Sequence, residues 1–404
     1  MRALRALAAF DGERFMPGGA TVFVEDGVIE GFESVGCEVP ADCRLTTFEG
    51  TLLPGLFDGH VHLVSDAALG SLERAGSLDA DAVDNIIEHS LRQQAAAGVT
   101  TVRDLGDVGY RTLGFRDSPR TDLPRITAAG PPLTVPDGHC HYLGGVVEGP
   151  DGIRAALSEH EQRGVDVIKV MASGGMTTLG TDPFGVQFEA ADLRTLVEAA
   201  HAAGLPVLAH AHSLAGIRHA LAAGVDGIEH FTGLTETGIR VPDEVLEAVA
   251  GAGVFVNPTL GVDREALASM PAPRPGIAAA LKRIGLDVET AQAARLQVLQ
   301  RAQNHGIRLV SGVDAGAAPA KRHGIVSLAL AALTEGGFSI ADAVATATTV
   351  AAQACGLAQV TGRLQPGLAA DILVVDGNLE HDITALQRPA TVLIRGNPLT
   401  PPPT

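Results

Sequence analysis

Short apolar runs alternate along the chain with longer segments whose apolar residues recur at helical spacing. The apolar runs end near residues 57, 105, 129, 172, 210, 230, 257 and 314. Segments 82–97, 190–203, 214–223, 243–252 and 290–305 have the helical spacing, and several end in Ala-Gly, which favours helix termination. Eight strands alternating with helices predict the α/β class and a (β/α)8 barrel of the TIM type. An open doubly wound sheet is the alternative, but it predicts a glycine-rich nucleotide-binding turn that the first strand lacks.

The two ends of the chain have a different pattern, with period-two alternation and β-branched runs. Strand-like segments lie at 21–25 and 27–32, and again at 371–375 and 391–395. Neither end has enough strands to bury a core alone, so we predict that both ends form one small β-sandwich domain. The alternative is two independent terminal sheets. The predicted domains are 1–52 and 359–404 for the two parts of the β-sandwich, and 53–358 for the barrel.

Composition narrows the class of protein and its partners. The chain has 404 residues, 46% of them hydrophobic, and a formal net charge of −18, which argues against nucleic-acid and anionic-membrane partners. Its four cysteines form no CxxC pair, and no apolar run has the length of a signal peptide or a membrane span. We therefore expect a reduced, soluble, cytoplasmic protein. Leucine and alanine on the outer helices are compatible with a homo-oligomer.

Histidine and aspartate residues gather where the predicted strands end, which is the active-site face of barrel enzymes. His60 and His62 follow the first strand, and residues two apart in an extended chain point to the same side. Further candidates end later strands: His210, His212, His230 and Asp314. A single histidine in such a place is more often a core or surface residue, but their repetition at successive strand ends favours a metal site. Histidine and carboxylate ligands without cysteine suit Zn²⁺, or Mn²⁺, Co²⁺ or Ni²⁺.

Lys169 lies in the apolar strand segment Val-Ile-Lys-Val-Met-Ala. A buried ammonium group is costly unless it is paired or loses its charge. One interpretation is a side chain that reaches outward to solvent. The other is a lysine of depressed pKa that faces the barrel mouth and reacts with carbon dioxide, giving a carbamate whose two oxygens can bridge two metals.

These residues and their surroundings resemble the amidohydrolase superfamily in its binuclear form. The resemblance rests on Gly-Leu-Phe-Asp-Gly-His-Val-His-Leu at 55–63, Lys-Val-Met-Ala-Ser-Gly-Gly at 169–175, Gly-Ile-Glu-His at 227–230 and Gly-Arg-Leu-Gln-Pro-Gly-Leu-Ala-Ala-Asp-Ile-Leu-Val at 362–374. The resemblance covers nearly the whole chain. Within the superfamily, these motifs are similar to those of the imidazolonepropionase-like, prolidase-like and ochratoxinase-like branch. The motifs are specific for the superfamily and much less so for the substrate.

The resemblance implies two divalent metal ions and a role for each motif residue. His60 and His62 would bind the more buried metal with Asp314. N-carboxylated Lys169 would bridge to a second metal, which His210 and His230 also hold. His212 would lie further out as a transition-state donor, and His139, after the third strand, would lie over the substrate. A plain surface-loop histidine is the alternative for His139.

The resemblance also implies hydrolysis of an amide or peptide bond, with a small-molecule or peptide substrate. A hydroxide held between the metals would attack the carbonyl, and Asp314 would act as general base and then general acid. Dipeptides, Xaa-Pro dipeptides and N-acyl amino acids are the expected substrates, compatible with peptide or natural-product processing. His141 and Arg322 are further substrate-binding candidates. Lys321 and Arg103 are two other cations that could meet a substrate carboxylate, although each of these cations could also be a surface residue.

Three other functions remain as alternatives. A one-metal cyclic-amide hydrolase or deaminase of the imidazolonepropionase type would not need Lys169. A non-enzymatic scaffold would be expected to have lost ligands, whereas every ligand position here is occupied. Ser-His-Asp catalysis would need a Gly-x-Ser-x-Gly turn after a strand, and Ser-Gly-Gly at 173–175 does not match it.

Overall fold

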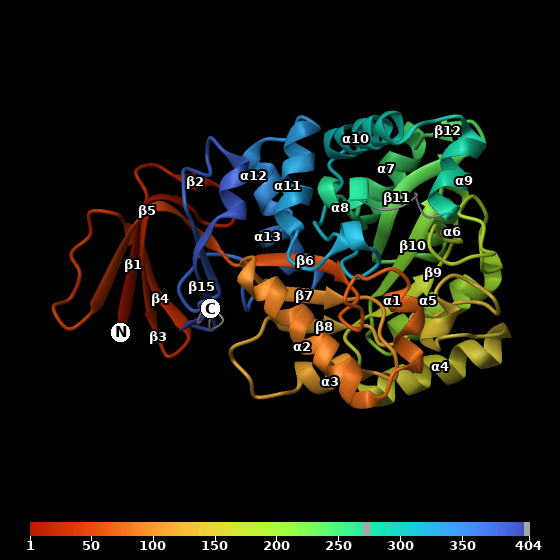
Figure 1. Cartoon of the computed structure of the whole chain (residues 1–404), viewed down its shortest axis with the longest axis horizontal. Helices are drawn as coiled ribbons and strands as arrows, with labels where there is room; N and C mark the ends of the chain where they lie inside the picture. The colour runs from red at the N-terminus through yellow and green to blue at the C-terminus, as the bar shows by residue number, and fades with distance from the viewer. Residues whose placement is uncertain (270–274, 400–404) are drawn as a thin grey trace.

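The two ends of the chain pair into one sheet, shown at the left of Figure 1. The computed structural model describes residues 1–269 and 275–399. The sheet has eight strands in the order β16-β15-β14-β5-β1-β3-β4, with β2 beside β1. Its strands are β1 (Arg2–Phe10), β2 (Phe15–Met16), β3 (Ala20–Glu25), β4 (Val28–Ser34), β5 (Arg44–Pro54), β14 (Ile372–Val375), β15 (Pro389–Ile394) and β16 (Asn397–Pro398).

The two ends are joined by the antiparallel pair of β5 and β14, in which Pro54 lies opposite Ile372, and by an antiparallel bridge between Val28 and Ala369. Side chains from both ends, such as Val22 and Leu393, share one buried cluster on this sheet. This pairing confirms the prediction that the ends associate, because each end supplies strands that the other needs to bury an apolar face.

The middle of the chain forms parallel strands flanked by helices. A three-stranded sheet contains β6 (Leu56–Val61), β7 (Val99–Asp104) and β8 (Arg125–Ala128). A five-stranded sheet contains β9 (Ile168–Met171), β10 (Val207–Ser213), β11 (Gly227–Thr235), β12 (Gly238–Ile239) and β13 (Phe255–Asn257). Single parallel bridges connect these segments further: Leu133 with Val170, Val256 with Leu309, and Val61 with Ala315. The α/β class is therefore confirmed, and strand neighbours follow the order of the chain.

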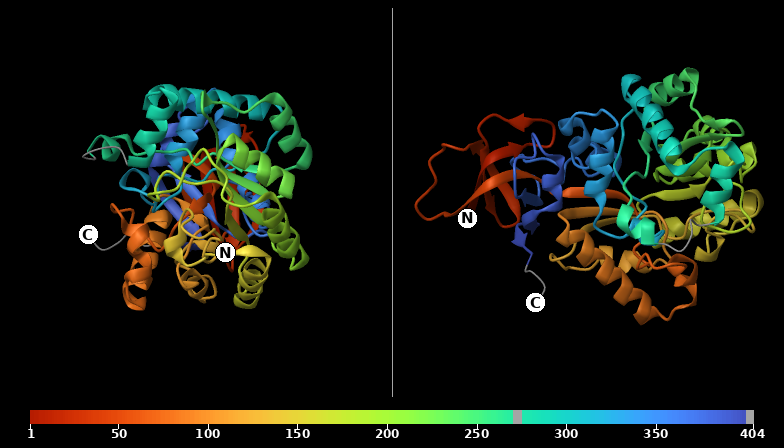
Figure 2. Two further views of the ribbon diagram at one scale, coloured as in Figure 1. Left: turned by 90° about the vertical axis from the view of Figure 1, so that its right-hand side faces the viewer. Right: turned by 45° about the horizontal axis from the view of Figure 1, so that its top comes forward.

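Helices lie around these strands, as Figure 2 shows from two further directions. They are α1 (Ser71–Arg74), α2 (Ala80–Ala96), α3 (Arg111–Arg116), α4 (Gly149–Arg163), α5 (Ala190–Ala202), α6 (Leu214–Ala223), α7 (Asp243–Ala252), α8 (Arg264–Ser269), α9 (Pro275–Ile284), α10 (Val288–Asn304), α11 (Val326–Glu335), α12 (Ile340–Ala345) and α13 (Thr349–Ala354). All five segments predicted from helical spacing are helices, with ends within two residues of the prediction. Side-chain caps help to set several of the starts; for example, Asp79 accepts a hydrogen bond from Ala82 N and Ser213 accepts one from Gly216 N.

Several helices lie outside the segments with predicted helical spacing, among them α4, α9 and α11, and one predicted strand is interrupted. Helix α4 was not predicted, because its surface is mostly polar and only Ile153, Leu157 and His160 are buried. The segment around Asp314 forms single bridges at Leu309 and Ala315 but no continuous strand. The left-handed φ of 61° at Asp314 interrupts extended backbone there.

Candidate metal centre

The first group of metal-ligand candidates joins β6 to a loop far along the chain. His60 lies in β6, His62 directly follows it, and both side chains are buried. Asp314 Oδ1 lies 3.4 Å from His60 Nε2 and 3.1 Å from His62 Nε2. One ligand atom from each residue lies within 4.8 Å of the other two, so the three side chains can hold one metal ion.

The second group comes from the neighbouring strands β10 and β11. His210, His212 and His230 also place one ligand nitrogen each within 4.8 Å of the others, and all three are buried. The ring of His230 lies 4.4 Å from that of His210 and 4.4 Å from that of His212, measured between centroids. We expected His210 as ligand with His212 further out, whereas the geometry makes both available to the same ion.

Unusual backbone conformations accompany these side chains. His230, Thr259 and Asp314 have left-handed φ values of 71°, 47° and 61°. Such values are uncommon for residues other than glycine, and strained backbone concentrates at functional sites. At His230 the pairing of β11 with β10 also loses its regular register. This local distortion gives the His230 side chain a direction that a regular strand would not give it.

Hydrogen bonds to one ring nitrogen leave the other nitrogen of each histidine free for a metal. His210 Nε2 donates to the carbonyl oxygen of Gly174 at 3.2 Å, which leaves Nδ1 unprotonated in the neutral ring. His230 Nδ1 lies 2.9 Å from Thr259 Oγ1, and His212 Nδ1 lies 2.9 Å from Thr232 Oγ1. In these two histidines Nε2 is the available atom.

Burial keeps most of these histidines neutral. Burial, followed by the neighbouring positive groups, lowers the pKa of His210 and His230 well below the ordinary value and that of His212 to about 3. The side chain of Asp314 is 20% exposed, and its carboxyl group has a lowered pKa because His60 and His62 outweigh the effect of partial burial. The site thus offers neutral imidazoles and an ionised carboxylate, the forms that bind metals.

Lys169 on β9 is the most unusual side chain of the site. It is 1% exposed, and its Nζ has no hydrogen-bond partner within the described part of the chain. Burial lowers the pKa of its amine to about 8, although the negative charges of Glu229 and Asp314 oppose the shift. The structure therefore excludes the alternative that Lys169 reaches outward to solvent.

Glu229, a buried acid for which the sequence pattern predicts no role, supports the first ligand group. Glu229 Oε2 accepts a hydrogen bond from His60 Nδ1 at 2.7 Å, and its Oε1 lies 3.2 Å from Arg103 Nη2. Arg103 is 3% exposed and also donates to the carbonyl oxygen of Gly59. Arg103 is thus committed to Glu229 and does not serve as a surface cation or a free partner for a substrate.

Asp58 is a second supporting residue that was missed. Its carboxylate accepts hydrogen bonds from Val313 N at 3.0 Å and from Gln94 Nε2 at 3.0 Å, and burial raises its pKa to about 6. It therefore ties β6 to the loop that carries Asp314. The only hint in the sequence was position, since Asp58 and Glu229 lie within two residues of a ligand histidine.

His139 belongs to the same constellation. Its ring lies 4.6 Å from that of His210, and Nδ1 lies 2.8 Å from Thr178 Oγ1. Gly175 makes room for it, because a Cβ on Gly175 would come within 2.2 Å of the His139 ring. Burial lowers the pKa of His139 to about 3, so this ring is neutral at physiological pH.

Within the described part of the chain, no hydrogen bond or ring contact joins the other two substrate-binding candidates to these histidines, although the charge of His141 contributes to the lowered pKa of His139. The partly buried His141 donates from Nδ1 to the carbonyl oxygen of Gly138 and packs edge-on against Tyr142. Arg322 is exposed and pairs with Asp263 at 2.9 Å. Their substrate-binding roles stay predictions.

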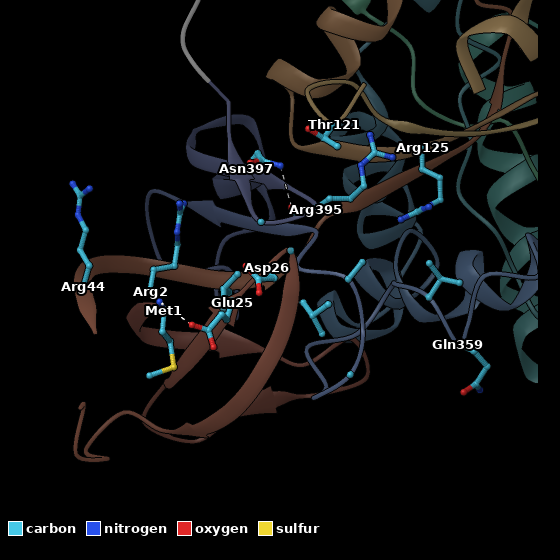
Figure 3. A pocket seen from close by; sticks show the side chains of 17 residues that line it. Met1, Arg2, Glu25, Asp26, Arg44, Thr121, Arg125, Gln359, Arg395 and Asn397 are labelled. Carbon is cyan, nitrogen blue, oxygen red and sulfur yellow. Dashed lines mark hydrogen bonds and ion pairs between the residues drawn. The ribbon is translucent and has the colours of Figure 1, made fainter. Parts of the chain in front are cut away.

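A separate cavity lies between the eight-stranded sheet and the β/α part. Figure 3 shows this cavity of about 870 Å³, where Arg125 and Arg395 lie side by side and Arg2 and Arg44 come from β1 and β5. None of the histidines described above lines it. It is therefore separate from the metal-ligand groups.

The donor set fits divalent metal ions. It consists of histidine nitrogens, one ionised carboxylate and a buried amine without a partner, and it contains no cysteine. Such a set suits zinc or a neighbouring first-row metal. Since the two groups of ligands face each other across His60 and His230, with ring centroids 5.3 Å apart, they can hold neighbouring ions.

Residues 51–399 match the family model described as "Amidohydrolase family", and this chain belongs to that family of metal-dependent hydrolases. It is similar to ochratoxinase of Aspergillus niger, with 27% identity over 84% of this chain and 73% of the relative. It is also similar to imidazolonepropionase of Salinispora tropica, with 25% identity over 96% and 93% of the two chains.

A solved structure extends the similarity to the whole fold. A prolidase in complex with N-methylphosphonate-L-proline superposes with a TM-score of 0.82 and 25% identity, covering 98% of each chain. Among the described residues, no helix is both long enough and apolar enough to cross a membrane.

Proposed function

We propose that this enzyme hydrolyses a carbon–nitrogen amide or peptide bond in a dipeptide, an Xaa-Pro dipeptide or an N-acyl amino acid. Support comes from the similarity to an ochratoxinase and to a prolidase, and from the ligand set. The single observation that carries the two-metal form of this proposal is Lys169, whose buried amine has no hydrogen-bond partner among the described residues and lies beside two facing groups of ligands. Cleavage of a different kind of substrate is an alternative outcome of the substrate test described below.

In this proposal Lys169 is N-carboxylated. Its neutral amine forms an N–C bond to carbon dioxide and releases a proton to solvent, so that a buried cation becomes an anionic ligand. His60, His62 and Asp314 would hold one divalent ion, His210 and His230 the other, and the carbamate would bridge them. Zn²⁺ is the preferred metal, with Mn²⁺, Co²⁺ or Ni²⁺ compatible. Divalent ions held there would lower the pKa of a water molecule and polarise the scissile carbonyl group.

Asp314 is the proton carrier of the proposed reaction. Its low pKa keeps it ionised, and its Oδ1 faces both His60 and His62. It would accept the proton of the attacking water and deliver a proton to the leaving nitrogen. The carboxylate thus returns to its starting form at the end of each turnover.

His212 and His139 would stabilise the negative charge that develops on the carbonyl oxygen. Thr178 Oγ1 already accepts a hydrogen bond from Cys140 N, so its own proton can go to His139 Nδ1. In that tautomer His139 carries its proton on Nε2 and can donate it to the substrate. Since both histidines are neutral, they donate hydrogen bonds without adding positive charge to the site.

The proposal includes a fold and a setting for this chemistry. The parallel strands and the bridges between them would form the closed (β/α)8 barrel, with domain limits at 1–52, 53–358 and 359–404; residues 400–404 lie outside the described part. The partner would be a small-molecule or peptide substrate in the cytoplasm. Nucleic acids and membranes are not proposed as partners, and a homo-oligomer is compatible with the proposal.

Metal content and activity of Lys169→Ala test the two-metal proposal, with exposed Lys282→Ala as the matched control. We expect two metals per chain in the native protein and in Lys282→Ala, and about one metal with at least a hundredfold lower kcat/KM in Lys169→Ala. Reloading of metal-depleted protein should also require bicarbonate. One metal per chain with activity retained in Lys169→Ala would instead support the one-metal cyclic-amide hydrolase or deaminase.

The substrate is tested by a panel of dipeptides, Xaa-Pro dipeptides and N-acyl amino acids alongside cyclic amides. Hydrolysis of members of the first three sets supports the proposal. Opening of cyclic amides alone would show that the similarity to imidazolonepropionase is the better guide to substrate.

A further inference from the structure

Two cations lie beside the metal centre and form no ion pair with an acid among the described residues. Arg295, on α10, donates from Nη2 to the carbonyl oxygen of Pro258. Lys321, in the loop after Asp314, donates from Nζ to the carbonyl oxygen of Thr259, the residue after Pro258, at 2.8 Å. Two residues far apart in the sequence therefore bring their charged groups to consecutive carbonyls just after β13.

The position of these carbonyls places the cations next to the proposed reaction. Thr259 Oγ1 lies 2.9 Å from His230 Nδ1, so the residue that holds Lys321 also orients a metal-ligand histidine. The loop carrying Lys321 folds back onto the site, since Gly316 N donates to the Lys321 carbonyl oxygen at 2.8 Å. The two cations thus border the metal centre on the side of β13.

The charges of the two cations act on each other and on the metal-ligand group. Burial and then the charge of Arg295 lower the pKa of His212. Burial lowers the pKa of Lys321 to about 8, and the charge of Arg295 adds to that shift. Burial alone lowers the pKa of Arg295 to about 10. Two partly buried cations that repel each other are unfavourable unless an anion lies between or beside them.

Among the residues that the structure describes, no carboxylate group pairs with these two cations to offset their repulsion. Neither Arg295 nor Lys321 forms an ion pair there, whereas Arg301 on the same helix pairs with Asp243 and the neighbouring Arg322 pairs with Asp263. Asp314 is the acid whose charge acts most strongly on Lys321, and it is directed at His60 and His62. The two cations therefore keep unused capacity for an external anion.

We propose that Arg295 and Lys321 form a subsite for a free carboxylate of the substrate, the α-carboxylate of the amino acid that the reaction releases. The guanidinium group offers paired donors that match the two carboxylate oxygens, and the ammonium group adds a second charge. This subsite rests on the proposed function, because it would hold the leaving amino acid beside Asp314. It selects acids over the corresponding amides or esters.

The test compares probes that differ only in this group. The probes are the N-acetyl derivatives of glycine, phenylalanine and proline, each as free acid and as primary amide. For the native enzyme we expect a higher kcat/KM and a larger rise in melting temperature with the acids. In Arg295→Gln the preference for acids should fall about tenfold to a hundredfold, mostly through KM. Lys321→Met should also lower the preference for acids.

Controls separate the subsite from a general effect on folding. Arg301→Gln makes the same substitution on the same helix at a residue paired with Asp243, and it should retain the preference for acids. Arg295→Lys keeps the charge but loses the paired donors, so it should recover only part of the preference. Lys321→Met is the second variant if Arg295→Gln does not fold.

The outcomes distinguish the subsite from the proposed function. Hydrolysis with an acid preference unchanged in Arg295→Gln and Lys321→Met would overturn the subsite and leave the function intact. A melting-temperature rise with acids alone, lost in both variants, would support the subsite even if no probe is cleaved. Equal binding of acids and amides by the native enzyme, or no binding of either, would overturn it.

Discussion

His60 Nδ1 donates a hydrogen bond to Glu229 Oε2 at 2.7 Å, between two side chains that are each 1% exposed. This contact fixes the neutral His60 ring in the tautomer whose Nε2 faces Asp314. Arg103 pairs with the other oxygen of Glu229, so the acid is held from both sides. A histidine oriented in this way is ready to bind a metal without losing further side-chain freedom.

Glu229→Gln should weaken metal binding. The amide carries less negative charge toward His60 and leaves the buried Arg103 without its ion pair, so we expect metal affinity to fall about tenfold to a hundredfold. Chelator competition at constant pH measures the change. The exposed Glu247→Gln, on α7, is the matched control. An affinity equal to that of the native protein would contradict the role given to Glu229.

The metal-depleted protein should lose stability as the pH falls. Burial lowers the pKa of His139 and His212 to about 3, so the unfolded chain binds more protons than the folded one between about pH 6.5 and 3. Their contribution to stability is therefore present above pH 6.5 and is lost on acidification. Each of these two histidines lowers the free energy of unfolding by about 2 kcal/mol at pH 5 relative to pH 7.

Denaturant unfolding at pH 7 and pH 5 measures this loss. His139→Gln should reduce the difference in unfolding free energy between the two pH values, whereas exposed His201→Gln should not. A His139→Gln protein with the same pH dependence as the native one would show that His139 is not buried and neutral.

Gly175→Ala should displace His139 without removing the metal ligands. A Cβ at this position would come within 2.2 Å of the His139 ring, a distance at which one of the two must move. If His139 stabilises the transition state, kcat should fall about tenfold to a hundredfold while metal content stays unchanged. Gly185→Ala, in the same loop, meets its nearest atom at 3.6 Å and is the control. Full activity in Gly175→Ala would argue against this role.

The sequence by itself determined the strand ends and the polar residues that follow them. Parallel strands that alternate with helices bring their carboxyl ends to one side, so His60, His62, His210 and His230 could be grouped from periodicity alone. The apolar surroundings of Lys169 left two interpretations open, a side chain that reaches solvent and a buried amine of lowered pKa, and the structure shows the buried one. These are local properties, set by side-chain period and by the composition of short segments.

Only the tertiary structure decided which distant residues complete the site. Glu229 lies one residue from a ligand histidine but contacts a different one, His60, because the fold brings together side chains of β11 and β6, which belong to different sheets. Arg295 and Lys321 meet at consecutive carbonyls although a helix and a loop carry them. Such contacts depend on how elements pack across the fold, and the hydrophobic pattern of one segment carries no information about the partner that packing will bring to it.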